Sequence, residues 1–313
     1  MIRPLTLACC LAVVSSVSMA AEKFTVETAD DGVTVKHNGE LLTRYLFKSG
    51  AKPILWPLIG PHGKEITRSY PMVEEGKETE KKDHIHHRSF YFTHGNVNGV
   101  DFWAETGKNG TIEHRKLVKA EGGDQAVIVT QSEWVTPAGE KILGDQRTLT
   151  FGEFGKSVWI DFDLKLTALA PVEFGDTKEG SFGIRVAGTM KTTAEKGGQI
   201  VSSHGDTDLE AWGKAAPWVD YHGPVEGETV GIAILNHPSS FRYPTNWHVR
   251  TYGLFAANPF GLSDFTKGAQ HGEHKMAKGE SIDLRYRVLI HEGDEKQGKV
   301  AEAFQEYEKV KKP

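Results

Sequence analysis

Four histidines lie within the segment DHIHHRSFYFTH, residues 83–94. The spacing of His84 and His86 lets two imidazoles on one face of a strand share a metal ion, because alternate residues lie roughly 6–7 Å apart. Neutral imidazoles suit zinc, iron, nickel or copper, so a divalent metal held by His84 and His86 is one interpretation. The others are a metal-free site in which one of His84, His86 and His87 transfers protons, and a polar patch with a structural role only.

The alternation of the segment predicts a strand from His84 to His94. A period of two then places His86 and Arg88 on the same face as His84 and His94, and His87 on the opposite face. His94 lies eight residues beyond His86, too far along a straight strand to bind the same ion. We therefore expect Arg88 and His94 to contact substrate rather than a shared metal.

The segment ends in a turn, because Asn98-Gly99 is a strong signal for chain reversal. A returning strand over residues 100–105 would carry Asp101 and Trp103 on one face. A carboxylate beside an indole is a common way to bind sugars, since the acid takes hydroxyls and the ring stacks on the apolar face. The alternative is that Asp101 caps a turn and Trp103 belongs to the core.

Charged residues concentrate in two further places. Glu179 lies in a glycine-bounded loop, and Arg185 lies on the strand that leaves it. A carboxylate near histidine and arginine can be tuned for proton transfer, so Glu179 is the preferred general acid or base. Farther along, His248 and Arg250 share one face of a predicted strand, where Arg250 can hold a carboxylate or sugar oxygen. Asn258 follows in the segment ANPFG.

These residues would be carried by an all-β fold. The chain has 34 glycines and 13 prolines that punctuate short alternating strands, and only residues 296–311 have helical spacing. No linker or repeat interrupts this pattern, so we expect one large β-sandwich over residues 21–313 with a short C-terminal helix. A supersandwich like that of galactose mutarotase is one form of this fold.

The first twenty residues have the pattern of a cleaved signal peptide: Arg3, an apolar run, and small residues before Ala21. We therefore expect a periplasmic or secreted protein. Cys9 and Cys10 are the only cysteines and would be removed with this segment, which excludes disulfides and thiolate chemistry from the rest.

The remaining chain offers few signs of other partners. Loss of Arg3 changes the net charge from −5 to −6, and no basic stripe is present, so nucleic acid is not an expected partner. No second long apolar segment follows, so no membrane span is expected. The P-loop and Gly-x-Gly-x-x-Gly motifs are missing, which argues against a nucleotide cofactor.

Three motifs together resemble a known family. DHIHHR at 83–88, HGNVNGVDFW at 94–103 and ANPFG at 257–261 are similar to secreted bacterial proteins of a domain of unknown function, often labelled methane oxygenase PmoA. Ile85 stands where the family pattern has proline. Methane oxidation is not expected, because a methane monooxygenase subunit is a bundle of membrane-spanning helices. The resemblance instead implies a β-sandwich protein with a role in sugar processing.

Together these features predict an exported carbohydrate-active enzyme that cleaves a glycoside, or an oxidised 3-keto glycoside, by hydrolysis or lyase chemistry. Glu179 would form an acid–base pair with one of His84, His86 and His87. An aldose-epimerase-like sugar isomerase and a non-catalytic sugar-binding protein are the alternatives. The residues expected to contact a carbohydrate or other small-molecule substrate are Arg88, His94, Asp101, Trp103, Arg185, His248, Arg250 and Asn258.

Overall fold

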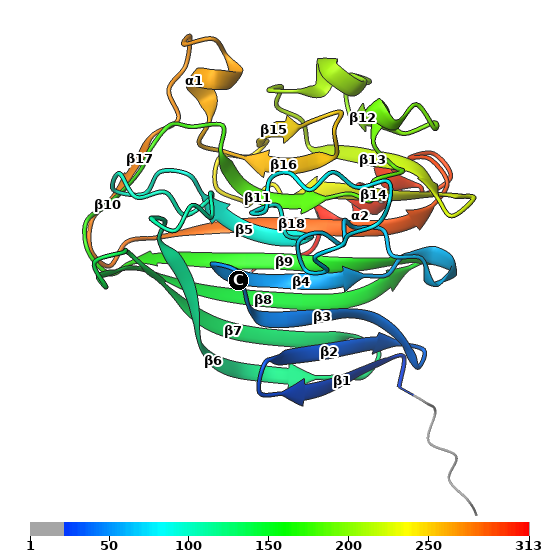
Figure 1. Cartoon of the computed structure of the whole chain (residues 1–313), viewed down its shortest axis with the longest axis horizontal. Coiled ribbons are helices and arrows are strands. Elements are labelled where there is room, and N and C mark those ends of the chain that lie inside the picture. The colour runs from blue at the N-terminus through cyan, green and yellow to red at the C-terminus, as the bar shows by residue number, and fades with distance from the viewer. Residues whose placement is uncertain (1–21, 313) are drawn as a thin grey trace, which may run out of the picture.

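A computed structural model describes residues 22–312 as two large antiparallel sheets packed face to face (Figure 1). The predicted signal peptide, residues 1–20, lies outside the described residues. Sheet 1 has the strand order β1-β2-β3-β4-β5-β11-β16-β15, and sheet 2 has the order β12-β13-β14-β18-β9-β8-β7-β6. A two-stranded sheet of β10 and β17 lies beside them. The predicted all-β sandwich is confirmed.

The strands of sheet 1 are β1 (Phe24–Ala29), β2 (Gly32–His37), β3 (Glu40–Ser49), β4 (Lys52–Leu58), β5 (Phe90–His94), β11 (Gly180–Arg185), β15 (Asn246–Val249) and β16 (Leu254–Asn258). Those of sheet 2 are β6 (Thr111–Glu121), β7 (Ala126–Val135), β8 (Lys141–Phe154), β9 (Ser157–Ala168), β12 (Gln199–Ser202), β13 (Trp218–Val225), β14 (Glu228–Asn236) and β18 (Ser281–Glu292). The remaining elements are β10 (Val172–Phe174), β17 (His274–Met276), η1 (Pro61–Gly63), η2 (Thr192–Ala194), η3 (Asp208–Ala211), α1 (Leu262–Phe265) and α2 (Val300–Tyr307).

The core lies between the two sheets and is held by interdigitating aromatic rings. Phe90 of β5 packs edge-on against Phe162 of β9, with ring centroids 5.5 Å apart. Phe182 of β11 stacks on both Phe162 and Tyr286 at 5.0 Å. Because strand side chains alternate, burying Phe90 and Phe182 in this layer directs Tyr91 and Gly183 to the outer face of sheet 1.

Most sequence-predicted elements are present, but the strand predicted over residues 84–94 is confirmed only for Phe90–His94, and the strand predicted over residues 100–105 is absent. Residues 84–89 form a turn, because His84 and Ser89 have φ values of 44° and 57°, a left-handed conformation that no strand tolerates. Residues 101–105 form no strand, since Asp101 folds them into a capped turn. The predicted reversal at Asn98-Gly99 is confirmed by the bridge between Val97 and Val100. The C-terminal helix is present but shorter than residues 296–311.

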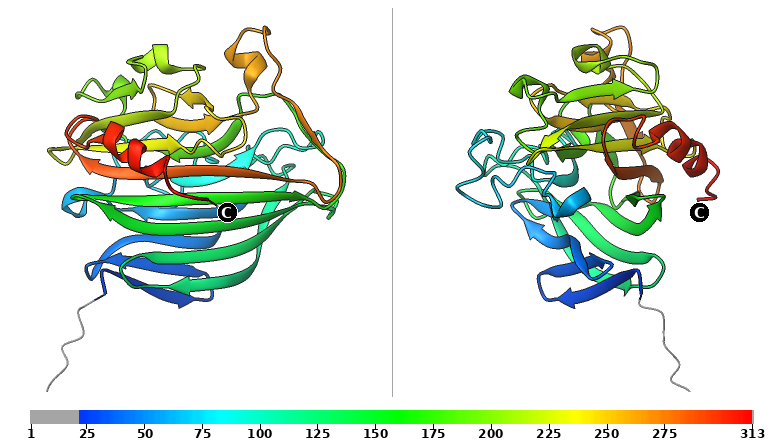
Figure 2. Two further views of the ribbon diagram at one scale, coloured as in Figure 1. Left: turned by 180° about the vertical axis from the view of Figure 1, so that it is seen from behind. Right: turned by 90° about the vertical axis from the view of Figure 1, so that its right-hand side faces the viewer.

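The outer faces of the two sheets are covered differently. Helix α2 packs on β14 and β18 of sheet 2. The outer face of sheet 1 is covered by the long connection between β4 and β5, residues 59–89, called here the β4–β5 loop. The two lie on opposite sides of the sandwich in the right-hand view of Figure 2. None of the helices within residues 22–312 is long and apolar enough to cross a membrane.

Sheet 2 contains a fully buried ionic group. The two carboxylate oxygens of Asp220 contact Nδ1 of His222 and Nε2 of His291, each at 2.7 Å. The other ring nitrogen of His291 lies 3.1 Å from the backbone carbonyl of Glu292. Because both partners of His291 are acceptors, the ring must donate from both nitrogens and is an imidazolium. Burial alone would lower its pKa, but the charge of Asp220 raises it overall.

Replacing His291 with glutamine is expected to flatten the pH dependence of stability. A folded-state pKa above the ordinary value of 6.5 means that the imidazolium stabilises the fold below that pH. This contribution is lost as pH rises through the raised pKa. Urea unfolding from about pH 6 to 9 should therefore show a steeper loss of unfolding free energy in the native protein than in His291→Gln. His204→Gln, which removes an exposed imidazole, should behave like the native protein; equal slopes in all three proteins would contradict the assignment.

Candidate active site

One oxygen of the Asp83 carboxylate collects three partners on the outer face of sheet 1. Oδ1 lies 2.9 Å from Nη1 of Arg68, 3.3 Å from Nη2 of Arg185 and 3.3 Å from Nδ1 of His84. Burial alone would raise the pKa of Asp83, but Arg185, His84 and Arg68 lower it overall. The carboxylate is therefore ionised, and it is shared by two guanidiniums that are almost fully buried.

Arg68 fixes the shape of the β4–β5 loop. Its Nη1 donates to the carbonyls of Lys81 and Asp83, and its Nη2 donates to the carbonyls of His84 and His87. These backbone bonds hold residues 81–87 in a compact turn around the guanidinium. An extended strand would direct neighbouring side chains to opposite faces. The turn instead brings the three neighbouring imidazoles together.

The histidine cluster, defined here as His84, His86 and His87, is the main result of that turn. The rings of His84 and His87 stack at 4.8 Å with an interplanar angle of 5°. The His86 ring lies 4.4 Å from His87 in an edge-to-face arrangement. The expectation that His87 faces away from the other two is wrong, because it assumed an extended chain. The structure instead unites the three histidines predicted to carry acid–base chemistry.

The hydrogen bond from Arg185 determines the tautomer of His87. Nη1 of Arg185 lies 3.0 Å from Nδ1 of His87. A guanidinium can only donate, so Nδ1 is the acceptor and the proton of the neutral ring is on Nε2. Burial, reinforced by the neighbouring His86 and by Arg185, places the pKa of His87 well below its ordinary value. His87 is thus a neutral hydrogen-bond donor whose lone pair is already occupied.

His84 has the opposite arrangement. Its Nδ1 faces the Asp83 carboxylate, which accepts a proton and cannot donate one. The Nδ1–H tautomer leaves the Nε2 lone pair available. The side chain is 41% exposed, so His84 is the cluster member most open to solvent. Of the cluster, His84 is the member arranged as a general base.

Lys52 and Glu105 border the cluster beside His86. Lys52 is fully buried and pairs with Glu105 at 2.7 Å, and burial lowers its pKa to about 8 despite that partner. Burial, then the charge of Lys52, lowers the pKa of His86 to about 3, so this imidazole is neutral. Arg88 also binds Glu105, at 2.7 Å. The guanidinium of Arg88, predicted to contact substrate, is thus engaged by this carboxylate.

Tyr252 lies between the histidine cluster and the two other groups of charged residues predicted from the sequence, those around Glu179 and around Arg250. Its ring stacks on His84 at 5.6 Å, and the guanidinium of Arg185 lies 4.9 Å from the ring centroid. Arg250 lies against the same ring at 5.6 Å and against Trp212 at 5.7 Å. The charge of Glu179 raises the pKa of Tyr252, a smaller effect than that of burial. The predicted groups thus meet on one surface.

His248 and Asn258 hold backbone rather than substrate. Nδ1 of His248 lies 2.6 Å from the Lys178 carbonyl, and the Asn258 amide donates to the same carbonyl at 3.1 Å. Both side chains are buried, and burial lowers the pKa of His248 to about 4 even though Glu179 opposes this shift. The contacts that the structure gives these two predicted substrate-binding residues are to backbone carbonyls. They position the loop that presents Glu179, whose side chain is 41% exposed.

Three more predicted contacts have structural roles. His94 is fully buried, and its Nε2 lies 2.8 Å from the Gly175 carbonyl; burial lowers its pKa to about 4. Oδ1 of Asp101 accepts the backbone N–H groups of Trp103 and Ala104, which is the turn-capping alternative. Trp103 is 2% exposed and packs beside His86 and His87, so it supports the cluster instead of stacking on a sugar.

Several buried donors of this surface have no partner among the described residues. They are Nε of Arg68, Oη of Tyr91 and Nε1 of Trp103. Tyr91 lies across β11, where a Cβ at Gly183 would be only 2.8 Å from its Cζ, so glycine is required beneath the ring. The residues of this surface that were not predicted from the sequence are Lys52, Arg68, Asp83, Tyr91, Trp212 and Tyr252. Strand alternation could have found one of them, since it places Tyr91 on the face of β5 opposite Phe90.

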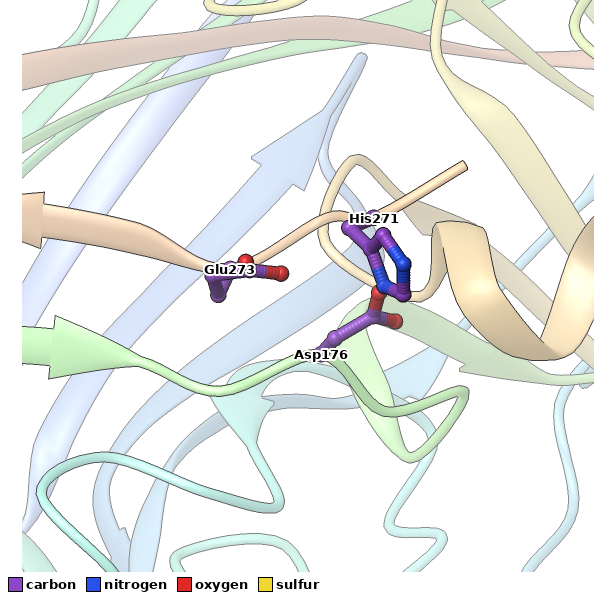
Figure 3. Close-up of side chains that lie close together, drawn as sticks. All are labelled: Asp176, His271 and Glu273. Carbon is purple, nitrogen blue, oxygen red and sulfur yellow. The ribbon is translucent and has the colours of Figure 1, made fainter. Parts of the chain in front are cut away.

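Three potential metal ligands converge at two places in residues 22–312, and neither includes His84 or His86. One group is Asp176, His271 and Glu273, which come from two neighbouring segments (Figure 3). The carboxylate of Asp176 already accepts backbone N–H groups there. The other group is Asp220, His222 and Glu295.

Comparisons with known proteins give one family and several distant structures. A family model described as a family of unknown function, DUF6807, matches residues 32–305. No curated protein sequence matches the chain.

Among solved structures, heparan sulfate lyase HepC from Pedobacter heparinus has 10% identity and a TM-score of 0.41, with 86% of this chain and 35% of that chain covered. GH36 alpha-galactosidase AgaA from Geobacillus stearothermophilus has 10% identity and a TM-score of 0.40, with 87% and 41% covered. A Glycoside Hydrolase Family 97 enzyme from Pseudoalteromonas sp. strain K8 has 11% identity and a TM-score of 0.32, with 85% and 34% covered. The chain spans about a third to two fifths of the length of these carbohydrate-active enzymes. Likenesses this distant carry no argument about its activity.

Nitrogen-15 NMR of the histidine side chains should reveal the tautomer of His87. We expect a neutral ring protonated at Nε2 between about pH 5 and 8, because burial opposes charging and Arg185 occupies Nδ1. His86 should also stay neutral over this range. Spectra of His86→Gln and His87→Gln would assign the two signals. A His87 signal that titrates near 6.5, or that carries its proton on Nδ1, would refute the assignment.

Proposed function

We propose that this chain, which belongs to the family of unknown function DUF6807, is an exported carbohydrate-active enzyme. It cleaves a glycosidic bond by acid–base chemistry on the outer face of sheet 1, in a plain or an oxidised 3-keto glycoside. The observation that carries this proposal is the Asp83–His84 contact at 3.3 Å beside two buried guanidiniums. A carboxylate that orients an accessible imidazole is a recurring arrangement for a general base.

His84 serves as the base in this mechanism. Its Nε2 removes a proton from the substrate, and Asp83 stabilises the imidazolium that forms. The same carboxylate also contacts Arg185 and Arg68, which hold it in position beside His84. His87 donates from Nε2 and stabilises negative charge that develops on a substrate oxygen.

Glu179 provides the second functional group. Its loop is held by His248 and Asn258, and its carboxyl is exposed near Tyr252, on whose ring His84 stacks. A carboxylic acid in this position can protonate the leaving oxygen. The half-exposed rings of Tyr252 and Trp212 offer faces for the apolar side of a sugar.

The distribution of carboxylates favours elimination over hydrolysis. Glycoside hydrolases generally use two carboxyl groups that flank the scissile bond. Here Asp83 and Glu105 are bound by arginines, whereas Glu179 pairs with Lys178, whose side chain is 40% exposed, so Glu179 is the more accessible carboxyl of this surface. In the elimination, which requires an oxidised substrate such as a 3-keto glycoside, His84 takes a proton from the carbon beside the carbonyl, the electron pair forms a C=C bond, the C–O bond breaks, and the leaving oxygen takes a proton from Glu179. A plain glycoside has no such carbonyl and would be cleaved by hydrolysis.

Substitution of either acid–base residue is expected to lower turnover by about a hundredfold or more, because general acid–base groups typically contribute that much. The variants are His84→Asn and Glu179→Gln, assayed on glycosides and 3-keto glycosides with product detected by chromatography. His62→Asn, which changes an exposed histidine of η1, is the matched control and should retain full turnover. Full turnover in both His84→Asn and Glu179→Gln would overturn the proposal.

A further inference from the structure

The candidate active site is strongly cationic although the whole chain has a net charge of −5. Arg68, Arg185, Lys81 and Lys191 surround Asp83 closely enough to influence one another. Burial lowers the pKa of Lys191, and Arg185 and Lys81 lower it further, while Asp83 opposes them. Nearby, Glu179 already pairs with Lys178 at 3.2 Å. The positive charge of this surface is therefore not balanced by its own carboxylates.

Arg250 carries the part of this charge that a ligand can reach. It belongs to the turn between β15 and β16, where its backbone N–H donates to Leu254 and its carbonyl accepts from Gly253. The side chain is partly exposed, and its guanidinium packs against the rings of Trp212 and Tyr252. No carboxylate among the described residues pairs with it. The rings hold the planar group in place, which leaves its edge free to bind an anion.

From these contacts we propose that the site takes a sugar that carries a carboxylate, with Arg250 as the residue that binds this group. A guanidinium matches a carboxylate with two parallel hydrogen bonds, and the adjoining rings are suited to the sugar face. Arg185 and Lys191 add long-range attraction to the same anion. The inference rests on the proposed function, because it assumes that this surface binds a sugar.

Binding can be tested without turnover. The probes are the methyl glycosides of glucuronic and galacturonic acid, the neutral methyl glucoside and galactoside, and glucose 6-sulfate, measured by calorimetry at low and high salt. We expect at least one uronide to bind about tenfold more tightly than its neutral counterpart, with the difference reduced by salt. Arg250→Gln should abolish that preference. Arg115→Gln, which removes an exposed arginine of sheet 2, should preserve it.

Three results would overturn the inference: uronides that bind no better than the neutral glycosides or not at all, a preference for the sulfate ester alone, and an unchanged preference in Arg250→Gln. None of these results affects cleavage of neutral glycosides by His84 and Glu179. Loss of turnover in those two variants with uronide affinity retained would, in turn, leave the carboxylate site standing. The two proposals can therefore fail separately.

Discussion

The buried guanidinium of Arg68 is the constraint on which the site depends. Its charge is almost fully removed from water, and it is stabilised by four backbone carbonyls and the Asp83 carboxylate. Hydrogen bonds to charged groups contribute about 1.5–3 kcal/mol each, and leaving a buried charge without them is far more costly. The loop must therefore close around Arg68. Closure places Oδ1 of Asp83 within reach of Arg68, Arg185 and His84.

The two sheets have different roles in the fold. Sheet 2 is sealed by α2 on its outer face and contains the buried Asp220 group, which serves stability. The central strands of sheet 1 are short. Their outer face is covered by the β4–β5 loop and lies beside the segments that carry Glu179 and Arg250. Small residues there matter, because Gly183 admits the ring of Tyr91 beneath the cluster. The functional groups thus rest on a rigid sheet although most of them belong to loops.

Sequence reasoning predicted the sandwich, the turn at Asn98-Gly99 and the residues His84, His86, His87, Glu179 and Arg185. Local pattern suffices for these, since alternation and turn chemistry are written in neighbouring residues. The turn at residues 84–89 was missed because two non-glycine residues adopt a left-handed conformation that only tertiary contacts impose. Arg68 was missed for a related reason: its partners are mainly carbonyls, which every residue possesses.

The central claim is that the imidazole of His84, oriented by Asp83, breaks a glycosidic bond. An NMR time course of the native protein with glycosides and 3-keto glycosides tests this most directly, because it follows the linkage itself. The account predicts that the signals of the linkage disappear while a released alcohol or sugar accumulates, with a new C=C signal if elimination occurs. Epimers or anomers that interconvert with the linkage intact, or sugars that bind and remain unchanged, would contradict it.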